Sequence, residues 1–197
     1  MGLPQSQISY TVEEYLSFER QAEKRHEYLG GQIYAMAGES LEHSTINANL
    51  TMRLGIQLVG TPCRVLSPNM KVRTYTSGLY AYPDAAVVCG EPLFHDEHRD
   101  ILINPTVIIK VLSPSTEAYD RGEKFLRYRQ LETLADYVLV AQSQPLMEHF
   151  ERQPDQRWLY SAVNDLSGSM FIASISCELR LAEVYDRIVF SVPGLPS

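Results

Sequence analysis

Residues 104–116, "NPTVIIKVLSPST", form the most regular strand pattern in the chain and carry a lysine inside it. Side chains alternate between the two faces of a strand, so Lys110 shares one face with Ile108 and Leu112. The other face is aliphatic as well, which is typical of a central strand covered on both sides. A buried ammonium costs several kcal/mol unless a carboxylate or water meets it. The strand therefore predicts either a polar partner for Lys110 or a head group that reaches solvent.

The size and composition of the chain indicate one globular domain. The chain has 197 residues, of which 45% are hydrophobic and 21% charged. This length supports one substantial core and is too short for two ordinary domains, so we expect a single domain over residues 1–197. No segment approaches the roughly 20 apolar residues of a membrane span, and the N-terminus lacks the pattern of a signal sequence. We therefore expect a cytoplasmic protein without a membrane partner.

The charge of the chain limits the ways in which it can bind nucleic acid. The net charge is -7 and the pI is near 5.2, so the chain has no overall basic surface for coating DNA. An acidic protein can still act on phosphate when a divalent cation lies between its carboxylates and the substrate.

The cysteine pattern predicts reduced thiols. Cys63, Cys89 and Cys177 are widely spaced, and no two of them form a C-x-x-C motif. An odd number of cysteines at such spacing is typical of a cytosolic protein, and it favours neither a disulfide framework nor a zinc cluster.

The N-terminal third alternates between helix and strand patterns. Thr11 followed by Glu14 predicts a capping box at the start of a helix in "YTVEEYLSFERQAEK". "HEYLGGQIYAMAG" predicts two strands around a turn at residues 30–31. A second helix is expected from Ser40 to a stop near Gly60. Its sheet-facing side chains recur at four-residue spacing and are Ile46, Leu50 and Leu54.

The remaining two thirds contain mostly strand patterns. The expected order is a long hairpin over residues 63–90 with its turn at 76–78, the central strand, a helix over 120–134, a strand over 136–142, antiparallel strands over 146–180 around a turn at 153–155, and a short helix over 181–190. This order predicts an α/β (α+β) fold, in which helices flank a mixed sheet and antiparallel strands extend it toward the C-terminus.

Two segments carry charged residues in positions suited to a site. Asp84 follows Pro83 at the entry to the apolar strand in "YPDAAVV", where a site can form, although aspartate is also common in turns. In "YDRGEKFLRYRQ", Asp120 lies three residues before Glu123, as in a capping box. Asp120 also lies four residues before Lys124, as in an ion pair along a helix.

Three further residues are candidates with ordinary alternatives. Tyr128 continues the helical face of Lys124, and this face is expected to point back over the strand ends. Glu27 lies in an alternating strand, where a glutamate can equally face solvent. His43 lies near a helix start, where a histidine is often a hydrogen-bonded structural residue.

Four stretches together resemble a known family. "HEYLGGQIYAMAG" with a later histidine, "YPDAAVVCG", "VLSPSTEAYDRGEKFLRYRQL" and "DYVLV" are similar to the Uma-type family of restriction endonucleases, within the PD-(D/E)XK nuclease superfamily. The resemblance extends from about Thr11 to "LAEVYD" near the C-terminus. It implies a restriction-endonuclease-like fold and a Mg²⁺-dependent or Mn²⁺-dependent endonuclease that hydrolyses phosphodiester bonds, with DNA as the expected nucleic acid.

The resemblance also implies roles for individual residues. Asp84 is the first metal carboxylate, Glu27 is the matching acidic residue upstream, and Lys124 is the lysine, supplied from a helix. In such a site two carboxylates hold a hard cation, which polarises the phosphate and acidifies a bound water. The lysine balances the charge that develops in the transition state. The matched positions of a supporting kind are His43, Asp120 and Tyr128.

Lys110 is the departure from the family pattern. The family carries a glutamate at this position, in E-V-L-S-P-S-T, and this chain has a lysine. A metal ligand is thereby replaced by a cation, which is expected to weaken or abolish Mg²⁺ binding. Lys110 can instead pair with Asp84 or Glu27. We therefore expect Asp84, Lys110 and Lys124 to converge at one end of the central sheet, with Glu27 nearby.

Three functions are compatible with the sequence. The first is an endonuclease that still cleaves DNA through Asp84, Glu27 and Asp120, with Lys110 and Lys124 around the phosphate. The second is a catalytically degenerate binding or scaffold protein of the nuclease fold. The third is a domain that binds a small anion at its lysines. For an active enzyme we expect a homodimer, because cleavage of a duplex needs a cut in each strand.

Overall fold

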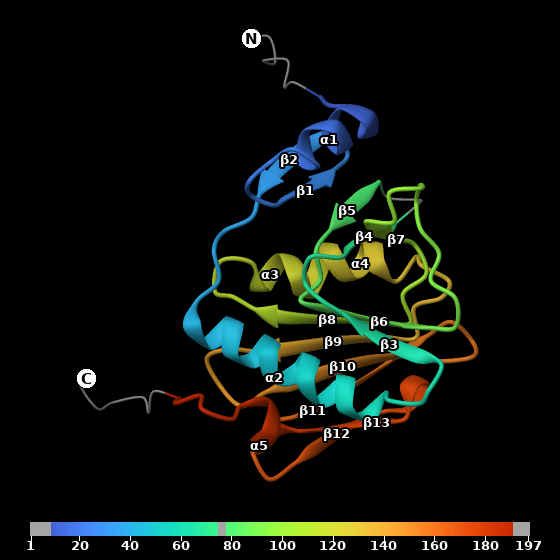
Figure 1. Ribbon diagram of the computed structural model, residues 1–197. Coiled ribbons are helices and arrows are strands. Elements are labelled where there is room, and N and C mark those ends of the chain that lie inside the picture. Colours follow the sequence, from blue (N-terminus) through green and yellow to red (C-terminus); the bar gives the residue numbers. More distant parts are fainter. Residues whose placement is uncertain (1–8, 75–77, 191–197) are drawn as a thin grey trace, which may run out of the picture.

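The computed structural model describes residues 9–74 and 78–190, and its largest sheet has six strands in the order β11-β10-β9-β8-β6-β3 (Figure 1). β8 and β9 are parallel, and the other neighbouring strands are antiparallel. All residues of β8 are buried, which confirms the predicted central strand. The bounds are β3 (Cys63–Leu66), β6 (Ala85–Cys89), β8 (Val107–Leu112), β9 (Asp136–Ala141), β10 (Met147–Arg152) and β11 (Trp158–Val163).

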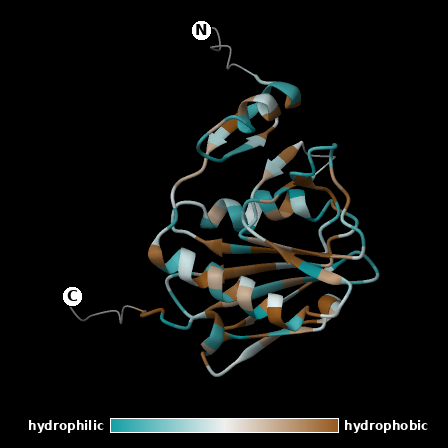
Figure 2. Cartoon of the chain, viewed as in Figure 1, coloured by the Kyte–Doolittle hydropathy of each residue, from teal (hydrophilic) through white to brown (hydrophobic). Residues whose placement is uncertain are grey.

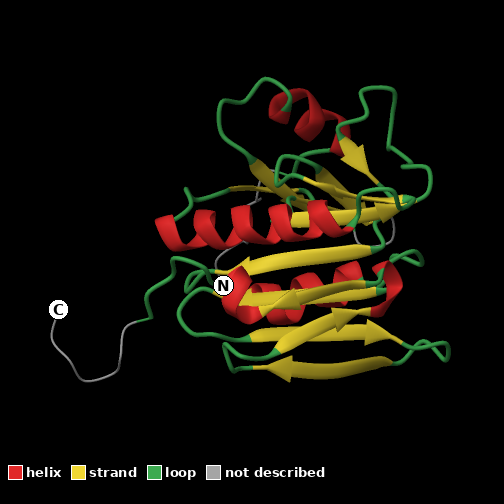
Figure 3. Ribbon diagram, turned by 60° about the horizontal axis from the view of Figure 1, so that its bottom comes forward, coloured by secondary structure: helices red, strands yellow, loops and turns green. Residues whose placement is uncertain are grey.

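Apolar layers cover both faces of this sheet, and its central strands are hydrophobic along most of their length (Figures 2 and 3). One face packs against α2 (Leu41–Gln57), whose side chains at four-residue spacing are fully buried, as predicted. Each such side chain contributes roughly 1.5–3 kcal/mol. The predicted N-cap, Ser40, accepts a hydrogen bond from the N–H of His43 at 3.1 Å. The other face packs against α4 (Phe125–Tyr128).

A second sheet has five strands in the order β2-β1-β5-β4-β7. Its helix, α1 (Val12–Glu19), begins with the predicted capping box, in which Thr11 and Glu14 each accept a hydrogen bond from the other's backbone N–H. The predicted hairpin around residues 30–31 is present, and Figure 1 shows it with α1 at one end of the molecule. The strands are β1 (His26–Leu29), β2 (Gln32–Ala35), β4 (Lys71–Thr74), β5 (Leu79–Ala81) and β7 (Ile101–Leu102).

The C-terminal part is antiparallel, as predicted. β10 and β11 form a hairpin around the predicted turn at residues 153–155. A two-stranded sheet follows and packs on the same sheet face as α2. The elements of this part are β12 (Ser169–Ile172), η2 (Ala173–Ile175), β13 (Cys177–Arg180) and the short helix α5 (Leu181–Val184).

The long hairpin predicted over residues 63–90 is divided between two sheets, so this prediction is wrong in part. The outer strands, β3 and β6, pair within the six-stranded sheet, whereas the inner strands, β4 and β5, pair within the five-stranded sheet. Both pairs are antiparallel, and alternation of side chains alone does not show where a hairpin changes sheet. Of the predicted turn at 76–78, only Gly78 is among the described residues, and its φ of +60° lies in the left-handed region that glycine favours.

The helix predicted over residues 120–134 begins earlier and ends earlier. It consists of α3 (Glu117–Tyr119), the π-helical segment η1 (Asp120–Lys124) and α4. Asp120 therefore lies inside the helix, and its predicted capping box with Glu123 is wrong. Turns follow α4, and in them Leu131 and Leu134 bury their side chains in the core. Of the helices in residues 9–74 and 78–190, none combines the length and the apolar character needed to cross a membrane.

The prediction of three reduced cysteines is wrong, because Cys63 and Cys89 form a disulfide. They are register partners on the antiparallel strands β3 and β6, at the edge of the six-stranded sheet. The two cysteines are 26 residues apart, and this spacing does not predict a disulfide, because only the strand register brings them together. Cys177 is free and buried, as predicted for a reduced thiol.

Removal of this disulfide is expected to lower the free energy of unfolding by roughly 2–4 kcal/mol, because the cross-link restricts the unfolded chain. Denaturant unfolding of the natural protein, with and without reductant, measures this loss. A variant with both Cys63→Ser and Cys89→Ser is the control, and reductant should leave its unfolding midpoint unchanged. A natural protein whose midpoint does not respond to reductant would show that the two thiols are not cross-linked in solution.

Candidate functional site

A cavity of about 590 Å³ lies where the β1–β2 hairpin, the start of α2, the strand ends of β6 and β8, and the α3–η1 helix meet. Figure 1 shows these elements around the segment that connects β2 to α2. The antiparallel pairing of β6 with β8 places Asp84, just before β6, and Lys110, in the second half of β8, at the same end of the central sheet. The cavity brings together six of the predicted site residues: Glu27, His43, Asp84, Lys110, Asp120 and Lys124.

Lys110 forms a buried ion pair with Asp84. Its Nζ lies 2.8 Å from Asp84 Oδ2 and donates a second hydrogen bond to the carbonyl oxygen of Tyr82 at 3.2 Å. Both side chains are only 6% exposed. The predicted polar partner of Lys110 is therefore Asp84, and the alternative of a head group in solvent is excluded.

Three groups contact the carboxylate of Asp84: the Lys110 ammonium, the backbone N–H of Val111 and the His43 imidazole. The backbone N–H of Asp84 donates to the carbonyl oxygen of Ile109 at 3.0 Å, which extends the pairing of β6 with β8 to the cavity. Its Oδ2 also accepts the N–H of Val111 at 2.7 Å, and its Oδ1 lies 3.0 Å from His43 Nε2. These contacts from the strand, the lysine and the histidine together fix the orientation of the Asp84 carboxylate.

Burial and nearby positive charge shift the pKa of Asp84 in opposite directions. Burial is the largest single effect and would raise this pKa, because it disfavours the charged carboxylate. The charge of Lys110, followed by the hydrogen bond and charge of His43, outweighs burial, and the pKa lies below its ordinary value. Asp84 is therefore ionised at neutral pH, as an ion pair with Lys110 requires.

Lys124 forms the second buried ion-pair cluster. Its Nζ lies 2.9 Å from Glu27 Oε1 and 3.2 Å from Asp120 Oδ1. Burial lowers the pKa of Lys124, but the charges of Glu27 and Asp120 outweigh it, and the pKa is raised. The predicted pair between Asp120 and Lys124 is confirmed, and Glu27 joins it from the β1–β2 hairpin, 97 residues away in the sequence.

Tyr82 links the two ion pairs through its backbone. Its N–H donates to Glu27 Oε1 at 3.3 Å, while its carbonyl oxygen accepts from Lys110. Its hydroxyl donates to Glu19 of α1 at 2.7 Å. Tyr82 was not predicted as a site residue, and its position two residues before Asp84 is the only sequence signal that pointed to it.

Tyr128 lies outside the cavity. Its side chain is fully buried beneath the helix, in the apolar cluster that includes Tyr137 and Leu139. Burial, followed by the nearby charge of Glu27, raises its pKa well above the ordinary value. Tyr128 therefore does not line the cavity and packs under the Lys124 helix, and its supporting role stays a prediction.

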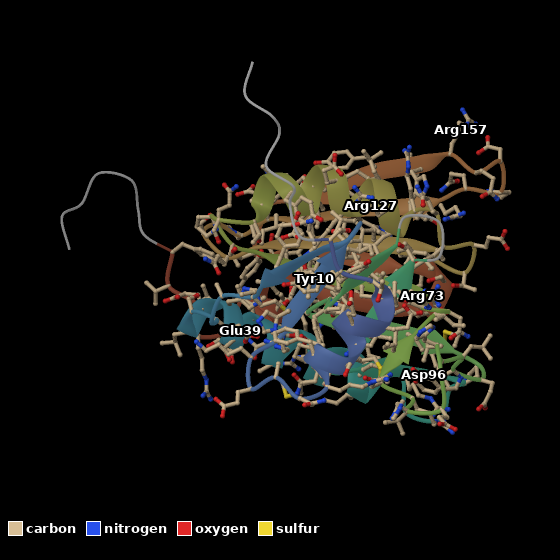
Figure 4. The ribbon with its side chains drawn as sticks, turned by 90° about the horizontal axis from the view of Figure 1, so that it is seen from above. Tyr10, Glu39, Arg73, Asp96, Arg127 and Arg157 are labelled. Carbon is tan, nitrogen blue, oxygen red and sulfur yellow. A yellow bond between two sulfur atoms is a disulfide. The ribbon has the colours of Figure 1, made fainter. Side chains whose placement is uncertain are left out.

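The cavity also contains polar and aromatic side chains that the sequence did not single out. Tyr34 lies on β2 directly across from Glu27. Glu39 also lines the cavity and lies beside the start of α2, as Figure 4 shows from above. Asp96, which forms an ion pair with Arg20, lies well away from Glu39 in that view. Further lining residues with hydroxyl or amide groups are Ser40, Ser113, Ser115, Thr116, Tyr119 and Gln142.

The residues as placed do not fit a divalent cation. Asp84 and Glu27, the expected metal ligands, each bind a lysine ammonium at hydrogen-bonding distance. Asp120 has carboxylate oxygens without a hydrogen bond among the described residues, but Lys124 lies beside it. Within residues 9–74 and 78–190, no group of three histidine, cysteine or acidic side chains is arranged to hold a metal. Binding of Mg²⁺ or Mn²⁺ at this site stays a prediction.

Comparisons with known proteins identify the family. The model of the Uma2 family, described as "Putative restriction endonuclease", matches residues 12–181. Uncharacterized protein slr1290 of Synechocystis sp. (strain ATCC 27184 / PCC 6803 / Kazusa) is 34% identical over 181 residues, which cover 90% of this chain and 92% of that protein. Uncharacterized protein sll1609 of the same strain is 33% identical over 149 residues, which cover 76% of this chain and 84% of that protein.

A solved structure shows the same fold. The crystal structure of a putative nuclease belonging to DUF820 from Anabaena variabilis ATCC 29413 has a TM-score of 0.75 with this chain, at 14% identity, and the match covers 91% of this chain and 99% of that chain. This likeness confirms the predicted α+β, restriction-endonuclease-like fold. The family match covers most of the chain and agrees with the resemblance found in its motifs. The chain belongs to the Uma2 family of putative restriction endonucleases.

Proposed function

We propose that this chain is a nuclease-fold protein that binds nucleic acid at the cavity and hydrolyses phosphodiester bonds poorly, because Lys110 takes the place of a divalent cation. The observation that carries the proposal is the buried contact of 2.8 Å between Lys110 Nζ and Asp84 Oδ2. An ammonium at this distance satisfies the carboxylate that the family resemblance assigns to the metal. Family membership supports the nucleic-acid ligand.

The chemistry of the reaction explains why this substitution matters. Hydrolysis of a phosphodiester requires an activated water and positive charge near the phosphate oxygens. Lys110 and Lys124 are the cations that can contact a phosphate, and Asp84, Glu27 and Asp120 offset their charge. In the described structure the carboxylates of Asp84 and Glu27 are engaged by these same lysines. The site therefore keeps groups suited to binding, while the two carboxylates that the resemblance assigns to the metal are each paired with a lysine.

Cleavage assays test this proposal. Supercoiled plasmid and circular single-stranded DNA are incubated with the natural protein, Lys110→Glu, and Lys110→Glu combined with Asp84→Asn, in Mg²⁺, in Mn²⁺ and in EDTA. We expect little cleavage by the natural protein and at least a tenfold gain in metal-dependent cleavage for Lys110→Glu, which restores the glutamate of the family pattern. The double variant should lose the gain.

Two outcomes would contradict the proposal. The first is a natural protein that cuts either DNA efficiently with metal and is unchanged or slower as Lys110→Glu, since Lys110 would then be a working part of the active site. The second is a Lys110→Glu variant that folds but neither cuts nor binds nucleic acid, since the cavity would then serve another ligand.

A further inference from the structure

Four charged residues that line the cavity are almost fully buried, and we call them the cavity floor. Asp84, Lys110, Asp120 and Lys124 are each 1–5% exposed. The cavity volume of about 590 Å³ is within the range of pockets that enclose a small-molecule ligand. Phosphates of an intact duplex lie along a stiff double strand, so they reach a shallow surface more readily than the floor of such a pocket. A nucleotide separated from its partner strand can enter.

An exposed aromatic ring stands beside these charges. Tyr34 is 52% exposed, lines the cavity and is the register partner of Glu27 on the β1–β2 hairpin. Register partners on antiparallel strands point to the same face, so the Tyr34 ring lies next to the carboxylate that holds Lys124. The neighbouring Ile33 points the other way and packs with Tyr28 in the small core under α1. The hairpin therefore buries one face and presents Tyr34 to the cavity.

A second aromatic ring approaches from the helix side. Tyr119 of α3 lines the same cavity, and the Lys124 ammonium lies 5.5 Å from the centre of its ring. Tyr34 and Tyr119 therefore come from two different walls, the hairpin and the helix, with Lys124 near both. Flat aromatic side chains next to a cation are the arrangement that single-stranded nucleic acid uses for its bases and its phosphates.

The lysines have donors left for a phosphate. An ammonium has three N–H donors. Lys124 donates one to Glu27 and lies 3.2 Å from Asp120 Oδ1 as an ion pair, and Lys110 donates one to Tyr82 and pairs with Asp84. As far as the described residues show, one donor on each lysine is left for a ligand. A phosphate at the cavity floor can accept these donors without breaking either ion pair.

We propose that the cavity takes one unpaired nucleotide, with its base stacked on Tyr34 and its phosphate near Lys124, so that the ligand is single-stranded or locally unpaired nucleic acid. The inference rests on the proposed function in taking a nucleic acid as the ligand, and it adds the structural class of that nucleic acid. Tyr34 is the residue that decides the class, because both faces of a base inside a duplex are already stacked on neighbouring bases. Stacking does not distinguish DNA from RNA.

Binding measurements without metal test the inference. Fluorescence anisotropy is measured with a labelled single-stranded DNA, the RNA of the same sequence and the corresponding DNA duplex, in EDTA and at low ionic strength. We expect the single strands to bind at least tenfold more tightly than the duplex. Tyr34→Ala should weaken single-strand binding roughly 5- to 150-fold, because stacking of one base on an aromatic ring contributes about 1–3 kcal/mol.

Matched variants separate stacking from general effects. Tyr34→Phe keeps the ring and should bind within about threefold of the natural protein, since Tyr34 makes no hydrogen bond among the described residues. Tyr160→Ala is the control, because Tyr160 is equally exposed at 53% but lies on β11, outside the cavity lining. It should leave binding unchanged.

Several results would overturn the inference. Equal or tighter binding of the duplex would do so, as would equal losses for Tyr34→Ala and Tyr160→Ala, or no binding of either single strand. These outcomes are distinct from failure of the proposed function. Duplex binding that ignores Tyr34, together with a cleavage gain for Lys110→Glu, would leave the proposed function intact and remove only the assignment of an unpaired nucleotide.

Discussion

Replacement of Asp84 by asparagine is expected to lower the free energy of unfolding by about 3–5 kcal/mol, measured by denaturant unfolding at neutral pH. Asp84 is 4% exposed and its carboxylate binds the ammonium of Lys110 at 2.8 Å. Asparagine keeps the shape and removes the charge, so a buried ammonium is left without its counter-ion. The expected loss is large because the ammonium of Lys110 that remains is only 6% exposed.

Two comparisons show whether the loss comes from the buried pair. Combining Asp84→Asn with Lys110→Met removes both charges and should recover much of the stability. Asp155→Asn breaks an ion pair of 2.6 Å with Arg157 that is exposed to solvent, and it should have no measurable effect. A loss of only a few tenths of a kcal/mol for Asp84→Asn would mean that the pair is open to water in solution.

The acid dependence of stability provides a second readout of the same variant. The folded-state pKa of Asp84 is lower than the ordinary value of 3.8, so the folded state binds its proton less readily than the unfolded state. Its stabilising contribution is therefore fully present above about pH 4 to 5 and is lost as the pH falls through this ordinary value toward the folded pKa. The natural protein should lose stability below about pH 4 more steeply than Asp84→Asn.

Lys110→Glu is expected to raise the affinity for Mn²⁺ by about a hundredfold or more. The change removes a cation that lies a few ångströms from the carboxylate of Asp84 and adds an anion at the same position, so both parts favour a divalent ion. Asp84 and the new glutamate then offer two carboxylates, and the cavity leaves room for water as further ligands. Lys124 and Glu27 keep their own pair and are unchanged by this substitution.

A neutral substitution separates the two parts of this effect. Lys110→Met removes the cation without adding a ligand, and its affinity should lie between those of the natural protein and Lys110→Glu. If Lys110→Met binds Mn²⁺ as tightly as Lys110→Glu, removal of the positive charge is the whole effect and the restored carboxylate contributes nothing.

Much of the fold could be predicted because its signals are local. The aliphatic run around Lys110 predicts a central strand, and β8 is buried on both faces. Thr11 with Glu14 predicts the first helix start, and Ser40 the second, because a capping bond forms between residues three apart. The strand ends that meet at the cavity follow from the order of these elements.

The features that could not be predicted depend on register between distant segments. The disulfide of Cys63 with Cys89 exists because β3 pairs with β6 in one register, and a shift of one residue would separate the thiols. The division of the residue 63–90 hairpin between two sheets is of the same kind. The alternation of apolar and polar residues does not predict which of two sheets a strand joins.

The candidate site shows the same limit. The sequence allows either Asp84 or Glu27 as the partner of Lys110. In the structure Lys110 pairs with Asp84, and Glu27 pairs with Lys124. The backbone of Tyr82 that joins the two pairs carries no side-chain signal. Tyr34 could have been found from its alternation with Ile33, but only the register opposite Glu27 gives the ring its place in the cavity.

The most direct test of the claim that Lys110 takes the place of a metal is a calorimetric titration with Mn²⁺. The natural protein, Lys110→Glu, and Lys110→Glu combined with Asp84→Asn are titrated at neutral pH, after circular dichroism has shown that each is folded. We predict one binding event for Lys110→Glu, and none of comparable affinity for the natural protein or the double variant. A natural protein that binds Mn²⁺ as tightly as Lys110→Glu, through Asp84, would contradict the account.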